Sequence, residues 1–167
     1  MNNKKMFSIA VKQLSISQVC ILAMEEISEL ITEISSIKSC KSSDHLCEEL
    51  VDVCITINLV KKAFKIKKSV IKEIKKKYKK DMKKEFEENS NKENIKTCIL
   101  ELTNLQKVIC KRVRGRHNKS ELVEAIAKTD IVIDYLISTK TDIKDYKKWT
   151  ATKLKRLSKR VDHNHII

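Results

Sequence analysis

The chain has 167 residues, a single glycine (Gly115) and no proline, and Lys plus Arg outnumber Asp plus Glu by 36 to 22. Tight turns and phosphate-cradling loops need residues that accept positive φ angles, so this composition excludes sandwiches, barrels and glycine-loop nucleotide folds. We therefore expect an all-α protein. Apolar residues make up 41% of the chain, which is enough for a hydrophobic core at this length.

The six cysteines form no CxxC pair and show no zinc-ligand spacing with the four histidines. We expect them to be reduced and to pack as small apolar side chains, as is usual in the cytoplasm. No apolar run approaches the roughly 20 residues of a membrane span. The first eleven residues lack the apolar stretch of a secretory signal. These features predict a soluble cytoplasmic protein without a membrane partner.

Hydrophobic periodicity divides the chain into helices. The predicted helices lie at about 15–37, 44–64, 68–88, 92–113, 119–138 and 142–161. Ser15 and Gln18 have the spacing of a capping box at the start of the first helix. We expect loops at 39–43 and 114–118, and a linker at 89–91.

The second half of the chain can be laid on the first with an offset of 75 or 76 residues. The offset pairs Leu30 with Leu105, Leu46 with Leu122, Glu48 with Glu124, Ile57 with Ile133 and Lys77 with Lys153. This pattern predicts a duplication, with residues 1–88 and 92–167 each forming a helical hairpin and a basic third helix. Because a helical hairpin cannot bury its own apolar face, the halves should pack together as a pseudo-dimeric helical bundle.

Lysine is concentrated in residues 61–84, which contain 13 lysines against Glu73 and Asp81, a local net charge of +11. Such a run is either a solvated helix face or a surface that attracts polyanions. Only Phe64 and Tyr78 are available there to stack on bases. So few aromatic residues disfavour a stacking surface for single-stranded nucleic acid, and we do not expect nucleic acid as the partner.

Two of the predicted helices carry stripes of carboxylates. The helix at 15–37 presents Glu25, Glu26, Glu29 and Glu33 on one side. The helix at 44–64 gathers His45, Glu48, Glu49, Asp52 and Thr56 in one sector and is apolar over most of the rest. If the hairpin closes, the Glu26-x-x-Glu29 and Glu49-x-x-Asp52 pairs converge with no basic residue near them.

Uncompensated buried ions cost several kcal/mol each, so a cation should lie between these carboxylates. Hard oxygen ligands favour Mg²⁺, with Mn²⁺ as a substitute. The alternative is an exposed acidic face that pairs with lysines of the third helix.

The segment Met24-Glu25-Glu26-Ile27-Ser28-Glu29-Leu30, followed after 19 residues by the Glu49-x-x-Asp52 motif, resembles a known signature. It is similar to that of the all-α nucleoside triphosphate pyrophosphohydrolases, the MazG-like group that includes the dimeric dUTPases. The resemblance covers residues 14–84, and a weaker second copy covers 93–161.

The resemblance implies Mg²⁺-dependent cleavage of a nucleoside triphosphate to its monophosphate and pyrophosphate. The implied metal ligands are Glu26, Glu29, Glu49 and Asp52. Glu25 or Glu48 would orient or deprotonate the attacking water. Lysines of the third helix, Lys77 foremost, would meet the leaving pyrophosphate. Asn58 would hydrogen-bond the base or sugar, or else form an interhelix hydrogen bond.

The second copy departs from the pattern at the metal ligands. Glu101 matches Glu26, but Asn104, Ala125 and Lys128 replace Glu29, Glu49 and Asp52. We therefore expect one active site per chain, in the first half. Lys128 and Lys153 either reach toward the substrate or pair with Glu101 and Glu124, and pairing is favoured because a buried lysine needs a counter-charge.

Other functions are compatible with the same residues. The chain could be a catalytically inactive nucleotide-binding protein of the same fold, or a basic helical nucleic-acid-binding protein. It could also form a homo-oligomer, since an internal pseudo-dimer can pair again.

Overall fold

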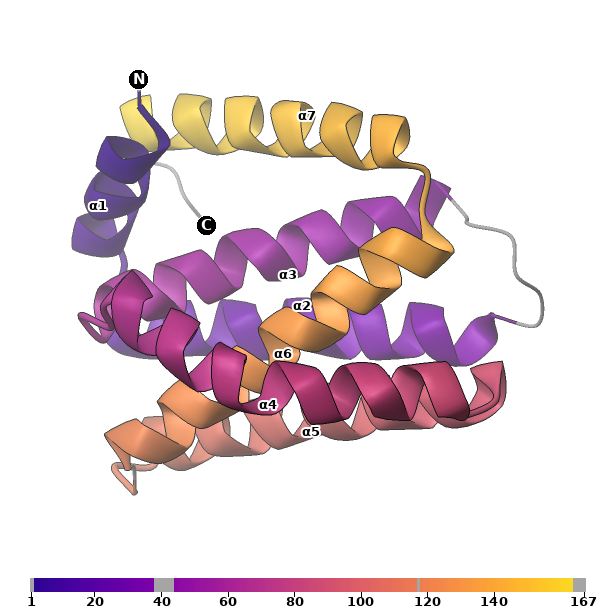
Figure 1. Ribbon diagram of the computed structural model, residues 1–167. Coiled ribbons are helices and arrows are strands. Elements are labelled where there is room, and N and C mark those ends of the chain that lie inside the picture. The colour runs from indigo at the N-terminus through magenta and orange to yellow at the C-terminus, as the bar shows by residue number, and fades with distance from the viewer. Residues whose placement is uncertain (1, 38–43, 117, 164–167) are drawn as a thin grey trace.

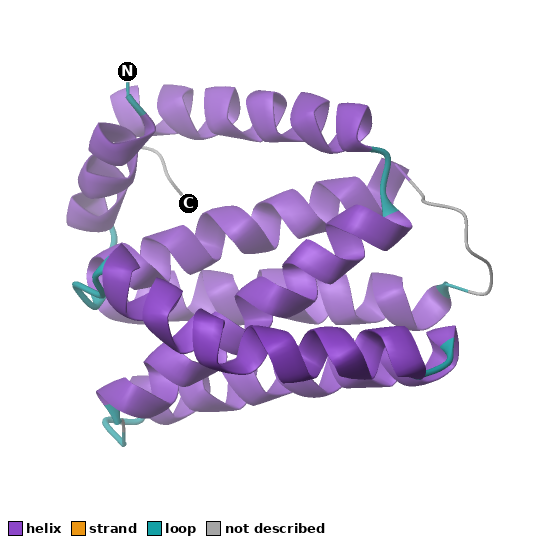
Figure 2. Ribbon diagram, in the orientation of Figure 1, coloured by secondary structure: helices purple, strands orange, loops and turns teal. Residues whose placement is uncertain are grey.

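The computed structural model describes residues 2–37, 44–116 and 118–163. All regular structure in these residues is helical, so the chain is an all-α helical bundle (Figures 1 and 2). The helices are α1 (Asn3–Gln13), α2 (Ile16–Ser36), α3 (Asp44–Ala63), α4 (Lys68–Glu88), α5 (Asn91–Val113), α6 (Lys119–Lys140) and α7 (Ile143–Asp162). The loop expected at 39–43 lies outside the described residues.

Six of the seven helices follow the sequence prediction closely. The capping box at the start of α2 is confirmed: Ser15 accepts a hydrogen bond from the Gln18 amide, and the Gln18 side chain accepts one from the Ser15 amide. Ser90 and Glu93 form a second capping box at the start of α5. Capping of this kind satisfies backbone amides that have no partner within the helix, and so sets where the helix begins.

The helices α2 and α5 pack against each other, and each also packs against the next helix in the chain, α3 or α6. The third helices are exchanged between the halves. Helix α4 packs on α6, whereas α7 packs on α3. The short helix α1 lies across α3 and α7. Each half of the chain therefore supplies a helix that packs on the hairpin of the other half.

Both halves contribute to one hydrophobic core. Among its fully buried side chains are Leu30 of α2, Leu50 of α3, Leu105 of α5 and Ile126 of α6. Burying a side chain of this size stabilises the fold by about 1.5–3 kcal/mol relative to leaving it exposed. Helix α3 is covered by α2 on one side and by α1 and α7 on others, which is why the polar residues along it face a cleft.

Five cysteines lie in the described residues, and all are free thiols. Three of them, Cys20, Cys47 and Cys98, are buried, and Cys20 and Cys98 pack in the apolar core as expected. No single described helix is long and apolar enough to cross a bilayer; only α1 and α2 taken together have the length and composition, and they are bent by 114°.

Candidate active site

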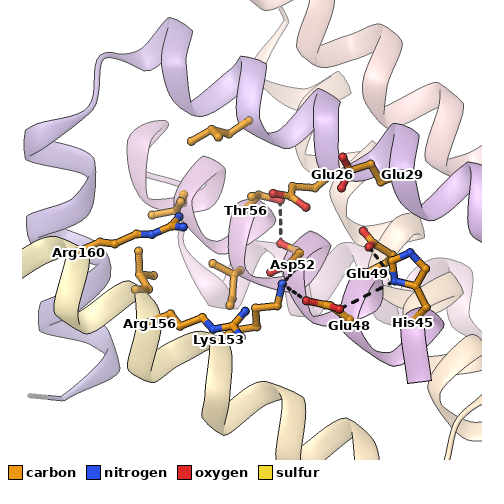
Figure 3. A pocket seen from close by; sticks show the side chains of 14 residues that line it. Glu26, Glu29, His45, Glu48, Glu49, Asp52, Thr56, Lys153, Arg156 and Arg160 are labelled. Atoms are coloured by element: carbon orange, nitrogen blue, oxygen red, sulfur yellow. Dashed lines mark hydrogen bonds and ion pairs between the residues drawn. The ribbon is translucent and has the colours of Figure 1, made fainter. Parts of the chain in front are cut away.

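Three carboxylates from α2 and α3 meet in one place. Carboxylate oxygens of Glu26, Glu49 and Asp52 lie within 4.8 Å of one another, close enough to bind a single metal ion. Glu29, one turn along α2 from Glu26, lines the same cleft (Figure 3). The structure thus brings together all four residues that the sequence pairs as metal ligands, three of them in a compact triad.

The triad is electrostatically uncompensated on its buried side. Glu49 is 7% exposed, and its Oε2 atom has no hydrogen-bond partner among the described residues. Burial, followed by the charges of the nearby Glu29 and Asp52, raises the pKa of Glu49 to about 7. Burial, followed by the charge of Asp52, likewise raises the pKa of Glu26 to about 7. Bringing like charges together in a buried site favours a proton or a cation there.

A divalent cation fits this donor set. The ligands are hard carboxylate oxygens without cysteine, which suits Mg²⁺ or Mn²⁺ better than zinc. The unpartnered Oε2 of Glu49 would gain the partner that buried polar atoms normally have.

The carboxylates have a lysine as a direct neighbour, which corrects the expectation that no basic residue lies near them. Lys153 of α7 lies with its Nζ atom 2.7 Å from Glu48 and also contacts Asp52. Burial lowers the pKa of Lys153, but its hydrogen bonds with Asp52 and Glu48 raise it overall. The expected pairing of Lys153 with Glu101 or Glu124 is not observed, because α7 packs on α3 of the other half.

Two further polar residues of α3 border the triad. The Nδ1 atom of His45 lies 3.4 Å from Oε1 of Glu49, and the imidazole is 65% exposed. Thr56 is buried, and its hydroxyl donates to the Asp52 carbonyl at 3.1 Å. His45 is therefore the solvent-facing partner of Glu49, whereas the Thr56 hydroxyl is engaged by the backbone.

The triad opens into a cleft of about 370 Å³ between α2, α3 and α7 (Figure 3). Its acidic side faces a basic side on α7 formed by Lys153, Arg156 and Arg160. The apolar lining consists of Leu22, Ile55, Leu59 and Leu157. Sequence reasoning missed the two arginines, although they follow Lys153 by three and seven residues, a spacing that places all three cations on one helical face.

Three residues singled out from the sequence lie elsewhere. Glu25 is exposed and does not line the cleft. Asn58 is exposed as well, and its amide donates to the Cys54 carbonyl one turn earlier at 2.8 Å, a bond within α3 and not between helices. Lys77 lies on α4, which packs on α6, with its ammonium 5.5 Å from the Tyr78 ring. Because the third helices are exchanged, Lys153 occupies the place expected for Lys77.

The matching region of the second half is filled by an ion pair. Lys128 lies 3.1 Å from Glu124, which confirms the pairing expected for this lysine, and 4.6 Å from the ring centre of Tyr78. The Tyr78 hydroxyl donates to Glu124 at 2.8 Å. Burial raises the pKa of Glu101, and Lys128 opposes that shift. The Lys128 ammonium therefore occupies the region of the second half that corresponds to the candidate metal site of the first half.

Comparison of the chain with protein-family models, with curated proteins and with solved structures found no match. The resemblance to the MazG-like group rests on the motif residues alone.

Proposed function

We propose that this chain is a Mg²⁺-dependent nucleoside triphosphate pyrophosphohydrolase that releases a nucleoside monophosphate and pyrophosphate. One observation carries the proposal: a compact carboxylate triad faces a row of three cations across a single cleft. A metal-bound polyphosphate needs both, because carboxylates hold the ion and cationic side chains neutralise the outer phosphate oxygens.

Glu26, Glu49 and Asp52 would hold Mg²⁺, with Glu29 at the edge of the same cluster. Bound Mg²⁺ supplies Lewis-acid chemistry, polarising phosphate oxygens and offsetting the charge that develops in the transition state. The raised pKa values of Glu26 and Glu49 mean that both carboxyls must lose their protons before they serve as ligands.

The cations of α7 would bind the triphosphate. Arg156 and Arg160 can each donate two parallel hydrogen bonds to phosphate oxygens. Lys153 neutralises Asp52 and Glu48 in the free protein and would turn toward the departing pyrophosphate once a metal ion neutralises Asp52. Glu48 would then be free to accept a proton from the attacking water, while the bond between the α-phosphorus and the bridging oxygen breaks and that oxygen leaves with pyrophosphate.

The apolar lining of the cleft favours a nucleoside over inorganic polyphosphate as the substrate. Leu22, Ile55 and Leu59 form an apolar wall on α2 and α3, and Leu157 adds to it from α7. Such a wall binds the sugar and base, which a bare phosphate chain lacks.

The test is a panel of the common ribo- and deoxyribonucleoside triphosphates with dUTP and dITP, incubated with Mg²⁺ and assayed for pyrophosphate and monophosphate. We expect both products from at least one nucleotide with the wild type and with Glu101→Gln, the matched control from the second half. We expect neither product from Glu49→Gln. Release of orthophosphate and a nucleoside diphosphate would contradict the proposed reaction.

The contact between Lys153 and Asp52 favours one other candidate, a catalytically inactive nucleotide-binding protein. There, Lys153 would neutralise the carboxylates permanently in place of a metal. That candidate predicts nucleotide binding that does not depend on Mg²⁺ and produces no turnover on any member of the panel.

A further inference from the structure

A second feature of the molecule lies at one end of the bundle, where two turns meet. Residues 61–68 include the end of α3, the connection and the first residue of α4, and residues 111–116 with 118–119 do the same for α5 and α6 (Figure 1). Together these segments contain ten lysines and arginines and no acidic residue. We call them the basic end. The Arg112 guanidinium lies 4.7 Å from the Phe64 ring centre, which places the two turns in contact.

Most of these cations point to solvent. Lys61 and Lys111 pair with Asp130 and Glu121, each at 2.8 Å. The exposed ones are Lys62, Lys65, Lys67, Lys68, Arg114, Arg116 and Lys119. None of these seven forms an ion pair within the part of the chain that the structure describes. A cleft of about 210 Å³ lies between the turns, with Lys65, Arg112 and Lys119 among its lining residues.

Helix stability does not explain the placement of these charges. Lys67 is the N-cap of α4 and makes no side-chain capping bond, and Lys68 is the first residue of that helix. Lys119 begins α6. Helix N-termini favour capping Ser, Thr, Asp or Asn residues and acidic side chains, since the helix dipole is positive there. Lysines at these three positions weaken the helices that they begin.

Lys65 has a backbone conformation that favours glycine. Its φ angle is +50°, and the Ile66 amide donates a hydrogen bond to the Lys61 carbonyl at 2.8 Å. This is the Schellman motif, which commonly ends a helix. Helix α5 ends in the same way, with a bond from Arg116 to Lys111 of 2.9 Å and Gly115 at +72°. The second turn uses glycine where the first keeps a strained lysine, which indicates that the charge itself is needed.

We propose that the basic end binds the phosphodiester backbone of a duplex nucleic acid. The charges extend over both turns, and so match a row of phosphates better than a single anion. Base stacking is not provided for, because Arg112 covers a face of Phe64. The large apolar residues exposed nearby, Ile16, Val70 and Val113, include no aromatic side chain, whereas helices that lie in a membrane interface commonly insert Trp or Phe. The site is independent of the candidate active site, with which it shares no lining residue.

The test measures fluorescence anisotropy of a labelled duplex of about 20 base pairs, over a series of salt concentrations. The key variant is the triple substitution Lys65→Gly, Lys67→Ser and Lys68→Gln. Its control is the triple substitution Lys144→Gln, Lys147→Gln and Lys148→Gln, which removes the same charge from exposed positions at the opposite end of the bundle, near the start of α7.

We expect the basic-end variant to bind the duplex at least about tenfold more weakly, and the slope of log affinity against log salt to fall by about two to three. The control should change affinity less than about threefold. The basic-end variant should also unfold at a higher urea concentration than the wild type, because it gains a glycine at positive φ and an N-cap serine. An unfolding midpoint at or above that of the wild type would exclude misfolding as the cause of weaker binding.

Three results would overturn the proposal: no duplex binding by the wild type, equal losses in the two triple variants, or preferential binding to vesicles containing phosphatidylserine. Glu49→Gln serves as a separate control. It should bind the duplex like the wild type whether or not the proposed hydrolase activity exists.

Discussion

The α2–α3 and α5–α6 hairpins share a packing pattern but differ in their charges. Each carries an acid at matching places, Glu26 and Glu101 on the first helix, and Glu48 and Glu124 on the second. In the first hairpin, two further carboxylates lie beside Glu26; Lys153 of α7 contacts one of them, Asp52, and Oε2 of Glu49 has no hydrogen-bond partner among the described residues. In the second hairpin, Lys128 supplies an internal ammonium. The difference shows that apolar packing can persist while three replacements, Asn104, Ala125 and Lys128, leave an ion pair where the first hairpin has a carboxylate cluster.

The exchange of third helices links the two hairpins. Helix α7 brings Lys153 from the second half to the triad of the first, and α4 brings Tyr78 from the first half to Glu124 of the second. Neither polar centre is therefore complete within one half of the chain.

Removing one carboxylate from each hairpin should distinguish their functions most clearly. If the proposed reaction is correct, Glu49→Gln should lower kcat/KM by at least about 100-fold, since it removes a ligand of the charge-stabilising ion. Glu101→Gln should leave kcat/KM within about threefold of the wild type, because Lys128 already compensates that region. Steady-state release of pyrophosphate measures both. Equal losses in the two variants would show that the hairpins do not differ in function.

Lys153→Gln tests whether the lysine competes with the metal. We expect Mg²⁺ to bind the variant about three- to tenfold more tightly, because Asp52 loses its internal counter-charge, while kcat falls about 10- to 100-fold through loss of a phosphate contact. Calorimetric titration without nucleotide gives the first quantity, and product release gives the second. A purely structural role for Lys153 would leave Mg²⁺ affinity unchanged or weaker.

The pH dependence of stability gives a third test, without metal. The pKa values of Glu26 and Glu49 are about 7 in the folded protein and near 4.3 in an unfolded chain. The folded state thus binds more protons between these values, so its free energy of unfolding decreases as the pH rises through 7. We expect Tm to fall by about 3–6 °C between pH 6 and pH 8.

Two controls assign this pH effect to the triad. Glu49→Gln should reduce the fall in Tm, and saturating Mg²⁺ should abolish it by binding the ionised carboxylates. A Tm that rises over the same range would contradict the electrostatic description of the site.

The smallest effect is expected in the second hairpin. Lys128→Gln should lower the free energy of unfolding by about 1 kcal/mol, since the pair with Glu124 is partly exposed and screened by solvent. Urea denaturation measures the loss. Adding Glu124→Gln should recover part of it, because the uncompensated acid is then removed. Additive losses in the double variant would indicate that the pair contributes no coupling.

Much of the fold could be predicted from local sequence. Apolar spacing and two capping boxes, at Ser15 and Ser90, place helix starts within a residue or two. Helix α1 was missed because it has only 11 residues and buries just Met6 and Ala10, too few positions to establish a helical period.

The candidate site was only partly predictable. Spacing within α2 and α3 places Glu26, Glu49 and Asp52 on the facing sides of two neighbouring helices, which local periodicity can reveal. Local periodicity cannot reveal whether α4 or α7 packs on α3. The prediction therefore assigned the phosphate contact to Lys77 first, missed Arg156 and Arg160, and overlooked how close Lys153 lies to Asp52.

The proposed function requires that the carboxylates of α2 and α3, and not their counterparts in α5 and α6, bind a divalent cation. Calorimetric titration of Mg²⁺ into the wild type, Glu49→Gln and Glu101→Gln tests it directly. We expect the wild type and Glu101→Gln to bind Mg²⁺ with the same affinity and stoichiometry, and Glu49→Gln not to bind it. Two equivalent sites in the wild type, or binding that survives in Glu49→Gln, would contradict it.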